Sequence, residues 1–397
     1  PWIEYWLGMC LLPIESRDSR NHFIRVYGRF TEGADIPGRL SAWCGIIETC
    51  VHDMANFADL DEWISLFENE LAAINDPANT ELNARVAVAM FSALMYRQPD
   101  HPQMGYWEEQ VREVIVKTPD VSQRLGLGSQ LLLYYTVWTG EIPKATVLLK
   151  TLKQSVDPEQ MDPLSQILWY STESTYWWKI GDANASIKSA KQGLEVAKAY
   201  DLNVYNVLLL ASGIYASCAQ NRLDQAAQYL QQMEQQLNRD RLVDVVHYNY
   251  LAAGLALLQG ELGVAREYAE AALQAGHQSG ALYPETLARL ILSLCLIRQE
   301  KLTEVVFHLS RISDLAERIN SHSLNYLNRL VASEAAFSCG ERERGVSFLK
   351  QACEHERDLG RVYHGYWWDR SLAENCIKAL SDDLEVEFIQ QLIRTHD

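Results

Sequence analysis

The chain has 397 residues, of which 48% are hydrophobic and 22% charged, with only 21 glycines and 11 prolines. This composition excludes a disordered, collagenous or low-complexity protein and provides enough apolar residues for a large core. The formal net charge is −17 and the basic residues form no run, so nucleic acid is not expected as a partner. The longest apolar start, residues 1–14, is shorter than the about 20 residues of a membrane span, and no membrane association is expected.

The ends and the cysteines give two further expectations. The chain opens on Pro1 rather than Met, with a helical pattern already running, so we expect a fragment of a larger chain. The eight cysteines lie singly in apolar stretches without any C-x-x-C pair, which is typical of a reducing compartment. A cytoplasmic protein is therefore expected.

In chain order, one early copy of the helical pattern follows Leu12-Pro13 and runs over residues 16–30, and another follows Asn56-Phe57 up to residue 71. A proline-rich insert at residues 98–103 interrupts the next pattern. Apolar helix-compatible sequence then alternates with turns. The C-terminal part predicts two final helices, over residues 366–380 and 384–394.

A turn of the form G-(D/E)-x-x-x-small recurs through the middle and C-terminal parts of the chain. Successive turns are 41, 40, 39, 40 and 40 residues apart, a regularity that indicates an internal repeat. Glycine or asparagine occupies the turn in five of six copies because a helix end favours a residue that tolerates the left-handed conformation. The six turn residues are Gly140, Gly181, Asn221, Gly260, Glu300 and Gly340.

Each turn joins about 16 residues of apolar helix to an amphipathic helix, so the repeat unit is a helical hairpin. A small residue five positions after the turn, and another seven later, are the offsets of the tetratricopeptide repeat (TPR). Nothing in the sequence indicates a strand. The predicted fold is all-α: a right-handed α-solenoid of about nine TPR-like hairpins with a period near 40 residues, forming a single domain over residues 1–397.

Motifs that carry chemistry are scarce. There is no P-loop and no nucleophile elbow, and the G-x-G at Gly126 lies within a helical stretch. Glu48 with His52, and Cys353 with His355, lack the further ligands of a zinc site. We therefore expect no enzyme, no metal and no cofactor in this segment, although an enzyme whose site is assembled from distant repeats remains the rival hypothesis.

A TPR-like solenoid has a concave groove, lined by positions about 13, 10, 6 and 3 residues before each turn. In the repeats ending at Gly140 to Gly260 these positions combine rings with polar groups, whereas Leu290, Leu294 and Ile297 are only aliphatic. Rings with a polar handle suit a binding site, and packing between helices is the alternative interpretation. The expected effector contacts are Gln130, Tyr134, Thr175, Trp178, Tyr215, His247, Tyr250 and Glu334.

Nearly the whole chain resembles the TPR sensor region of bacterial signal-transduction ATPases that regulate transcription, of the maltose-regulon-activator type with a bacterial transcriptional activator domain. The segments that carry the resemblance are PWIEYWLGMCLLPIE at residue 1, AMFSALMYRQPDHP at residue 89, GSQLLLYYTVWTGEIPKA at residue 128, HYNYLAAGLALLQGELGVAREYAEAAL at residue 247 and VEFIQQLIRTHD at residue 386.

The resemblance implies a sensor domain that binds an effector in its concave groove and controls a neighbouring switch ATPase. ATP is implied only for that neighbouring domain, and DNA only for an output domain, because this segment has neither a P-loop nor a basic recognition helix. The effector can be a small-molecule inducer or a protein or peptide partner, and the full-length protein can oligomerise. A TPR scaffold for protein assembly, without a small-molecule effector, is the alternative.

Overall fold

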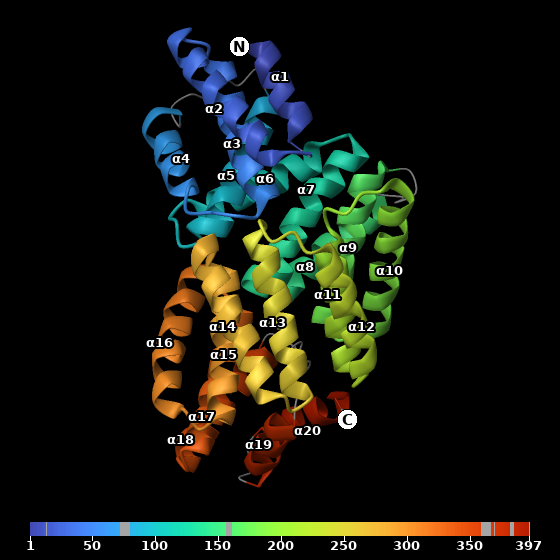
Figure 1. Ribbon diagram of the computed structural model, residues 1–397, viewed down its shortest axis with the longest axis vertical. Coiled ribbons are helices and arrows are strands. Elements are labelled where there is room, and N and C mark those ends of the chain that lie inside the picture. The colour runs from blue at the N-terminus through green and yellow to red at the C-terminus, as the bar shows by residue number, and fades with distance from the viewer. Residues whose placement is uncertain are drawn as a thin grey trace. The chain divides into compact units, whose positions relative to one another are not determined.

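The computed structural model describes residues 1–12, 14–71, 80–155, 161–358, 367–368, 370–381 and 385–396. Every regular element in these ranges is a helix, and none of them contains a β-strand (Figure 1). Consecutive helices pack in pairs, so the all-α, TPR-like fold expected from the sequence is confirmed. The chain divides into two compact units, and the single domain expected over residues 1–397 stays a prediction.

The first unit comprises residues 1–119, 239–243 and 275–282. Its core contains the buried side chains of Phe23, Val26 and Phe30. Arg85 donates to both carboxylate oxygens of Glu48 at 2.6 Å, so this partly buried cation is paired. The elements are α1 (Trp2–Leu11), α2 (Ser16–Glu32), α3 (Ile36–Asp53), α4 (Leu60–Leu66), the π-helical turn η1 (Phe67–Leu71), α5 (Thr80–Arg97) and α6 (Met104–Lys117).

The second unit comprises residues 120–238, 244–274 and 283–397. Helix follows helix in the order of the repeats, and α10 packs against both α9 and α11 (Figure 1). The elements are α7 (Val121–Leu133), the π-helical η2 (Tyr134–Thr139), α8 (Ile142–Ser155), α9 (Pro163–Lys179), α10 (Ala183–Tyr200), α11 (Asn206–Ala219), α12 (Leu223–Gln236), α13 (Leu242–Leu258), α14 (Leu262–Ser279), α15 (Leu282–Arg298), α16 (Leu302–Ile319), α17 (His322–Ser338), α18 (Arg342–Asp358), α19 (Arg370–Leu380) and α20 (Val386–His396).

The six predicted turn residues all adopt the left-handed backbone conformation. The four glycines have φ between 74° and 93°, and Asn221 and Glu300 have φ of 54° and 58°. The first helix of each hairpin therefore ends where the repeat predicts, because a left-handed residue reverses the chain while satisfying the last carbonyl groups of the helix. Glu300 adopts this conformation although its side chain disfavours it.

The small residues after the turns let the two helices of a hairpin approach closely. At Gly345 an added Cβ would lie 2.8 Å from Cδ1 of Phe337, a separation that packed atoms do not tolerate. The equivalent side chains of the other five repeats are fully buried: Ala145, Ser186, Ala226, Ala265 and Val305.

The C-terminal part differs from the prediction. The helix expected from residue 366 begins at Arg370, and Trp367 and Trp368 precede it in a non-helical conformation, while residue 366 itself lies outside the described residues. The last helix, α20, covers Val386–His396, and the predicted start at residue 384 also lies outside them. Within the described ranges, no helix is long and apolar enough to cross a membrane.

Candidate functional site

Side chains from the first helices of successive repeats form a row of aromatic rings in the second unit. Trp178 on α9 and Tyr215 on α11 are both buried, and their rings are stacked with centroids 4.1 Å apart and 13° between the planes. The ammonium nitrogen of Lys179 lies 4.8 Å from the centroid of the Trp178 ring. These positions meet because the inward side of each helix recurs at fixed offsets before the turn.

The row continues onto α13 through His247. The hydroxyl oxygen of Tyr215 lies 3.2 Å from Nε2 of His247, within hydrogen-bond distance. Desolvation by burial lowers the pKa of His247 from 6.5 to about 4. The ring is therefore neutral at pH 7. One of its nitrogens can donate a hydrogen bond and the other can accept one.

Trp367 joins this row from a distant part of the chain. Its ring centroid lies 5.9 Å from that of Tyr215 and 5.6 Å from that of Tyr250, and its side chain is buried. The indole covers the backbone of Gly254 on α13, where an added Cβ would lie 2.2 Å from two of its ring carbons. A glycine at this position is therefore what allows the ring to lie against the helix.

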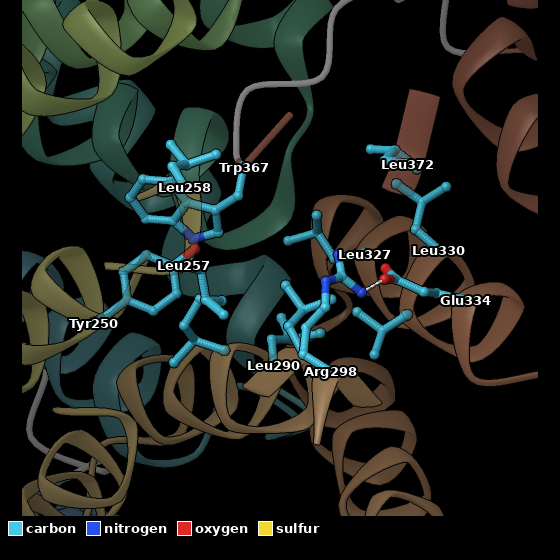
Figure 2. Close-up of a pocket in the computed structure, with 13 residues that line it drawn as sticks. Tyr250, Leu257, Leu258, Leu290, Arg298, Leu327, Leu330, Glu334, Trp367 and Leu372 are labelled. Atoms are coloured by element: carbon cyan, nitrogen blue, oxygen red, sulfur yellow. Dashed lines mark hydrogen bonds and ion pairs between the residues drawn. The ribbon is translucent and has the colours of Figure 1, made fainter. Parts of the chain in front are cut away.

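Next to Trp367 is a small cavity of about 50 Å³, formed mainly by α13, α15 and α17. Figure 2 shows Trp367 and Tyr250 at one end of this cavity and Arg298 with Glu334 at the other. Its wall is mostly aliphatic, and the lining residues are Tyr250, Leu257, Leu258, Leu290, Ile291, Leu294, Arg298, Leu327, Leu330, Val331, Glu334, Trp367 and Leu372.

The polar end of the cavity contains a charge pair. Arg298 on α15 donates through Nη1 to Oε1 of Glu334 on α17 (Figure 2). Ser371 on α19 donates through Oγ to the same oxygen at 3.0 Å. Because Glu334 is 4% exposed, these hydrogen bonds compensate for the desolvation of its carboxylate.

The expected contact residues do not all meet at this site. Tyr250 and Glu334 line the cavity, and Trp178, Tyr215 and His247 form the row of rings beside Trp367. The other three do not line the cavity, and the role of all eight in binding stays a prediction. Thr175 donates to the carbonyl of Ser171 in its own helix at 2.9 Å, Tyr134 packs against Tyr135, and Gln130 is half-buried on α7.

Sequence reasoning missed three features of the cavity. Leu290 and Leu294 were set aside as unable to orient a polar ligand, yet they line the cavity together with Arg298. Arg298 lies two residues before its turn and so off the expected stripe. Trp367 belongs to no repeat stripe, and only the glycine at position 254 of the inward stripe signalled that something bulky approaches the helix there.

In the described part of the chain, no group of three or more His, Cys, Asp or Glu side chains is arranged to hold a metal ion. Burial raises the pKa of the Cys218 and Cys295 thiols to about 12, which leaves both protonated and unreactive at neutral pH. The site thus combines aromatic rings, an apolar wall and one pair of opposite charges.

Comparison with known proteins finds neither a matching family model nor a matching curated protein. The crystal structure of a Rap protein complexed with competence and sporulation factor matches 90% of this chain and 99% of its own, with a TM-score of 0.52 and 13% sequence identity. The apo form of RapI matches 91% of this chain and 97% of its own, with a TM-score of 0.45 and 11% identity. At 13% identity, the first match shows the fold alone. It is TPR-like, and the maltose-regulon-activator type stays a prediction.

Proposed function

We propose that this chain is a non-catalytic regulatory domain that binds a peptide or a segment of a protein in the groove formed by α9, α11, α13, α15 and α17. The observation that carries the proposal is the continuous row of rings from Trp178 to Tyr250, which leads into an apolar cavity closed by Arg298 and Glu334. Rings and aliphatic walls provide contact area, while a few buried polar groups orient a ligand.

The structural neighbour supports a peptide or protein as the partner. The Rap protein with the same type of fold was crystallised in complex with competence and sporulation factor. A concave helical surface suits an extended peptide because several consecutive repeats can each contact one or two of its side chains.

The wider role follows from the resemblance found in the sequence. We propose that effector binding controls a neighbouring switch ATPase and, through it, transcription in the bacterial cytoplasm. The eight free cysteines agree with a reducing compartment. The alternative role is a TPR scaffold, in which the same groove holds a partner protein permanently and no effector regulates it.

The test begins by selecting binders from a displayed peptide library and measuring their affinities by calorimetry. Replacing Tyr250 by alanine removes a ring that is 2% exposed at the cavity, and we expect a loss of about 1 to 3 kcal/mol in binding free energy. Tyr215→Ala should have a similar effect. The matched control is Tyr200→Ala on α10, whose ring is 61% exposed and which should leave the affinity unchanged.

Two outcomes would replace the proposal. If no peptide binds but a metabolite raises the melting temperature, and Tyr250→Ala abolishes that effect, the effector is a small molecule. If a partner protein binds equally well to the wild type and to both groove variants, the groove is not the binding site and the scaffold role is favoured.

A further inference from the structure

The position of Trp367 in the row of rings is unusual because neither it nor Trp368 is part of a helix. It lies between helices α18 and α19, outside the repeat pattern, yet its indole is only 7% exposed. The rings of Tyr215 and Tyr250 lie close to it, at centroid distances of 5.9 and 5.6 Å, and the third contact is the bare backbone of Gly254. These three groups form a subsite for one flat ring, which we call the ring subsite.

The ring subsite depends on a glycine that the helix would otherwise avoid. Gly254 lies inside α13, where glycine is less favourable than alanine. A methyl group at this position would collide with the indole at 2.2 Å. The helix therefore has a glycine at the position where the flat indole of Trp367 approaches its backbone most closely.

Trp367 fills the ring subsite, but its indole N–H makes no hydrogen bond there to the part of the chain that the structure describes. Among the described residues, no hydrogen-bond partner lies within reach of its buried indole Nε1. A buried donor without an acceptor costs free energy, so the buried position of this side chain is less stable than that of a fully hydrogen-bonded one. The remaining cavity of about 50 Å³ has room for a few water molecules, below the roughly 300 to 1,000 Å³ of ordinary ligand pockets.

We infer that Trp367 is an internal occupant of the ring subsite, and that the effector is a peptide with an aromatic side chain that displaces Trp367 from its contacts with Tyr215, Tyr250 and Gly254. This inference rests on the proposed function and adds the chemical class of the ligand and a mode of regulation. Free effector must compete with a side chain that is always present at high local concentration. The groove therefore responds only above a threshold effector concentration, which Trp367 sets.

The test uses the full chain and a probe that needs no knowledge of the effector, N-acetyl-L-tryptophanamide, with N-acetyl-L-leucinamide as its aliphatic control. Trp367→Ala empties the ring subsite, and we expect this variant to bind the tryptophan probe at least about tenfold more tightly than the wild type does. The leucine analogue should show no such gain. Adding Gly254→Ala to the Trp367→Ala variant narrows the ring subsite and should abolish binding of the tryptophan probe.

A second measurement separates an occupant from a core residue. The Trp367→Ala variant should keep the helical circular dichroism signal and a melting temperature within a few degrees of the wild type. Trp6→Ala on α1, where the ring is 60% exposed, is the matched control for loss of an indole. If Trp367→Ala fails to fold or melts at a much lower temperature, Trp367 is part of the core and the inference is wrong. Equal affinity of the probe for the variant and the wild type also overturns it.

The selected peptides complete the test. Peptides that contain Trp, Tyr or Phe should bind Trp367→Ala about 5- to 50-fold more tightly than the wild type, and should compete with the probe. If they bind both proteins equally, competition by Trp367 is disproved while the proposed function stands. If no peptide binds either protein, the proposed function fails, and the probe still decides whether the ring subsite exists.

Discussion

The side chains of the groove are positioned by contacts between neighbouring repeats rather than within one repeat. Trp178 stacks on Tyr215, and Tyr215 contacts His247, so each ring is oriented by a residue one repeat away. The ion pair of Arg298 and Glu334 likewise joins two repeats. Such pairs make each residue of the site depend on the packing of adjacent hairpins.

The environment of His247 predicts how stability depends on pH. In the folded protein its pKa is lowered to about 4, so the ring stays neutral at a pH where the unfolded chain, with an ordinary pKa of 6.5, binds a proton. The unfolded state therefore binds more protons between pH 6.5 and pH 4. We expect His247 to make the free energy of unfolding fall by up to about 1.4 kcal/mol per pH unit as the pH decreases through this window.

Urea denaturation at pH 7, 6, 5 and 4.5 would measure this effect. In the His247→Gln variant the free energy of unfolding should fall less steeply with decreasing pH than in the wild type. His52 also has a pKa lowered by burial, in the first unit, and its contribution should be the same in both proteins. Identical slopes for the wild type and the variant would show that His247 is not desolvated.

At the level of the elements, the hairpin is defined by the left-handed residue between its helices. Five of the six repeat turns contain glycine or asparagine, which adopt this conformation at little cost. Glu300, between α15 and α16, adopts it with φ of 58° and no such advantage. The hairpin that forms one wall of the cavity is thus connected by the least favourable of the six turn residues.

Glu300→Gly should therefore stabilise the protein. Removing the Cβ relieves the left-handed strain, and after the greater entropy of glycine in the unfolded chain is subtracted we expect a gain of about 0.5 to 1 kcal/mol. The midpoint of thermal or urea unfolding measures this gain. Gly260→Ala at an equivalent turn, with φ of 81°, is the opposite change and should destabilise the protein. A loss of stability in Glu300→Gly would mean that its side chain makes contacts that outweigh the strain.

At the level of the whole molecule, the net charge of −17 affects how a partner arrives. A strongly negative protein attracts cationic ligands at long range, and salt screens this attraction because the Debye length shortens to about 8 Å at physiological ionic strength. We expect the same field to slow the approach of anionic peptides.

We expect a selected peptide extended by two lysines outside its contact region to associate faster than the unextended peptide. Its association rate should fall several-fold as the salt concentration rises from 20 to 300 mM, on the order expected for electrostatic steering, while its dissociation rate changes little. Stopped-flow fluorescence would measure both rates. A two-glutamate extension is the matched control and should show the opposite salt dependence. Association rates insensitive to salt would contradict the prediction.

The sequence by itself determined the hairpins of the repeat region and their turns. These features are local: a turn residue acts on the helix directly before it, and a small residue acts on the helix it faces within the same hairpin. The repeat at intervals of 39 to 41 residues then made the pattern visible, including the left-handed position of Glu300. For the same reason Tyr250 and Glu334 could be placed on the inward side of their helices from spacing alone.

Only the tertiary structure decided where the cavity lies and what fills it. Trp367 follows no repeat offset and precedes its helix instead of belonging to it, so no periodicity could direct it to Gly254. Arg298 lies off the inward stripe and enters the site because its long side chain reaches Glu334 on the next repeat. Contacts between residues far apart in the chain depend on how hairpins stack and where a connecting segment returns, and a single sequence contains no local signal for either.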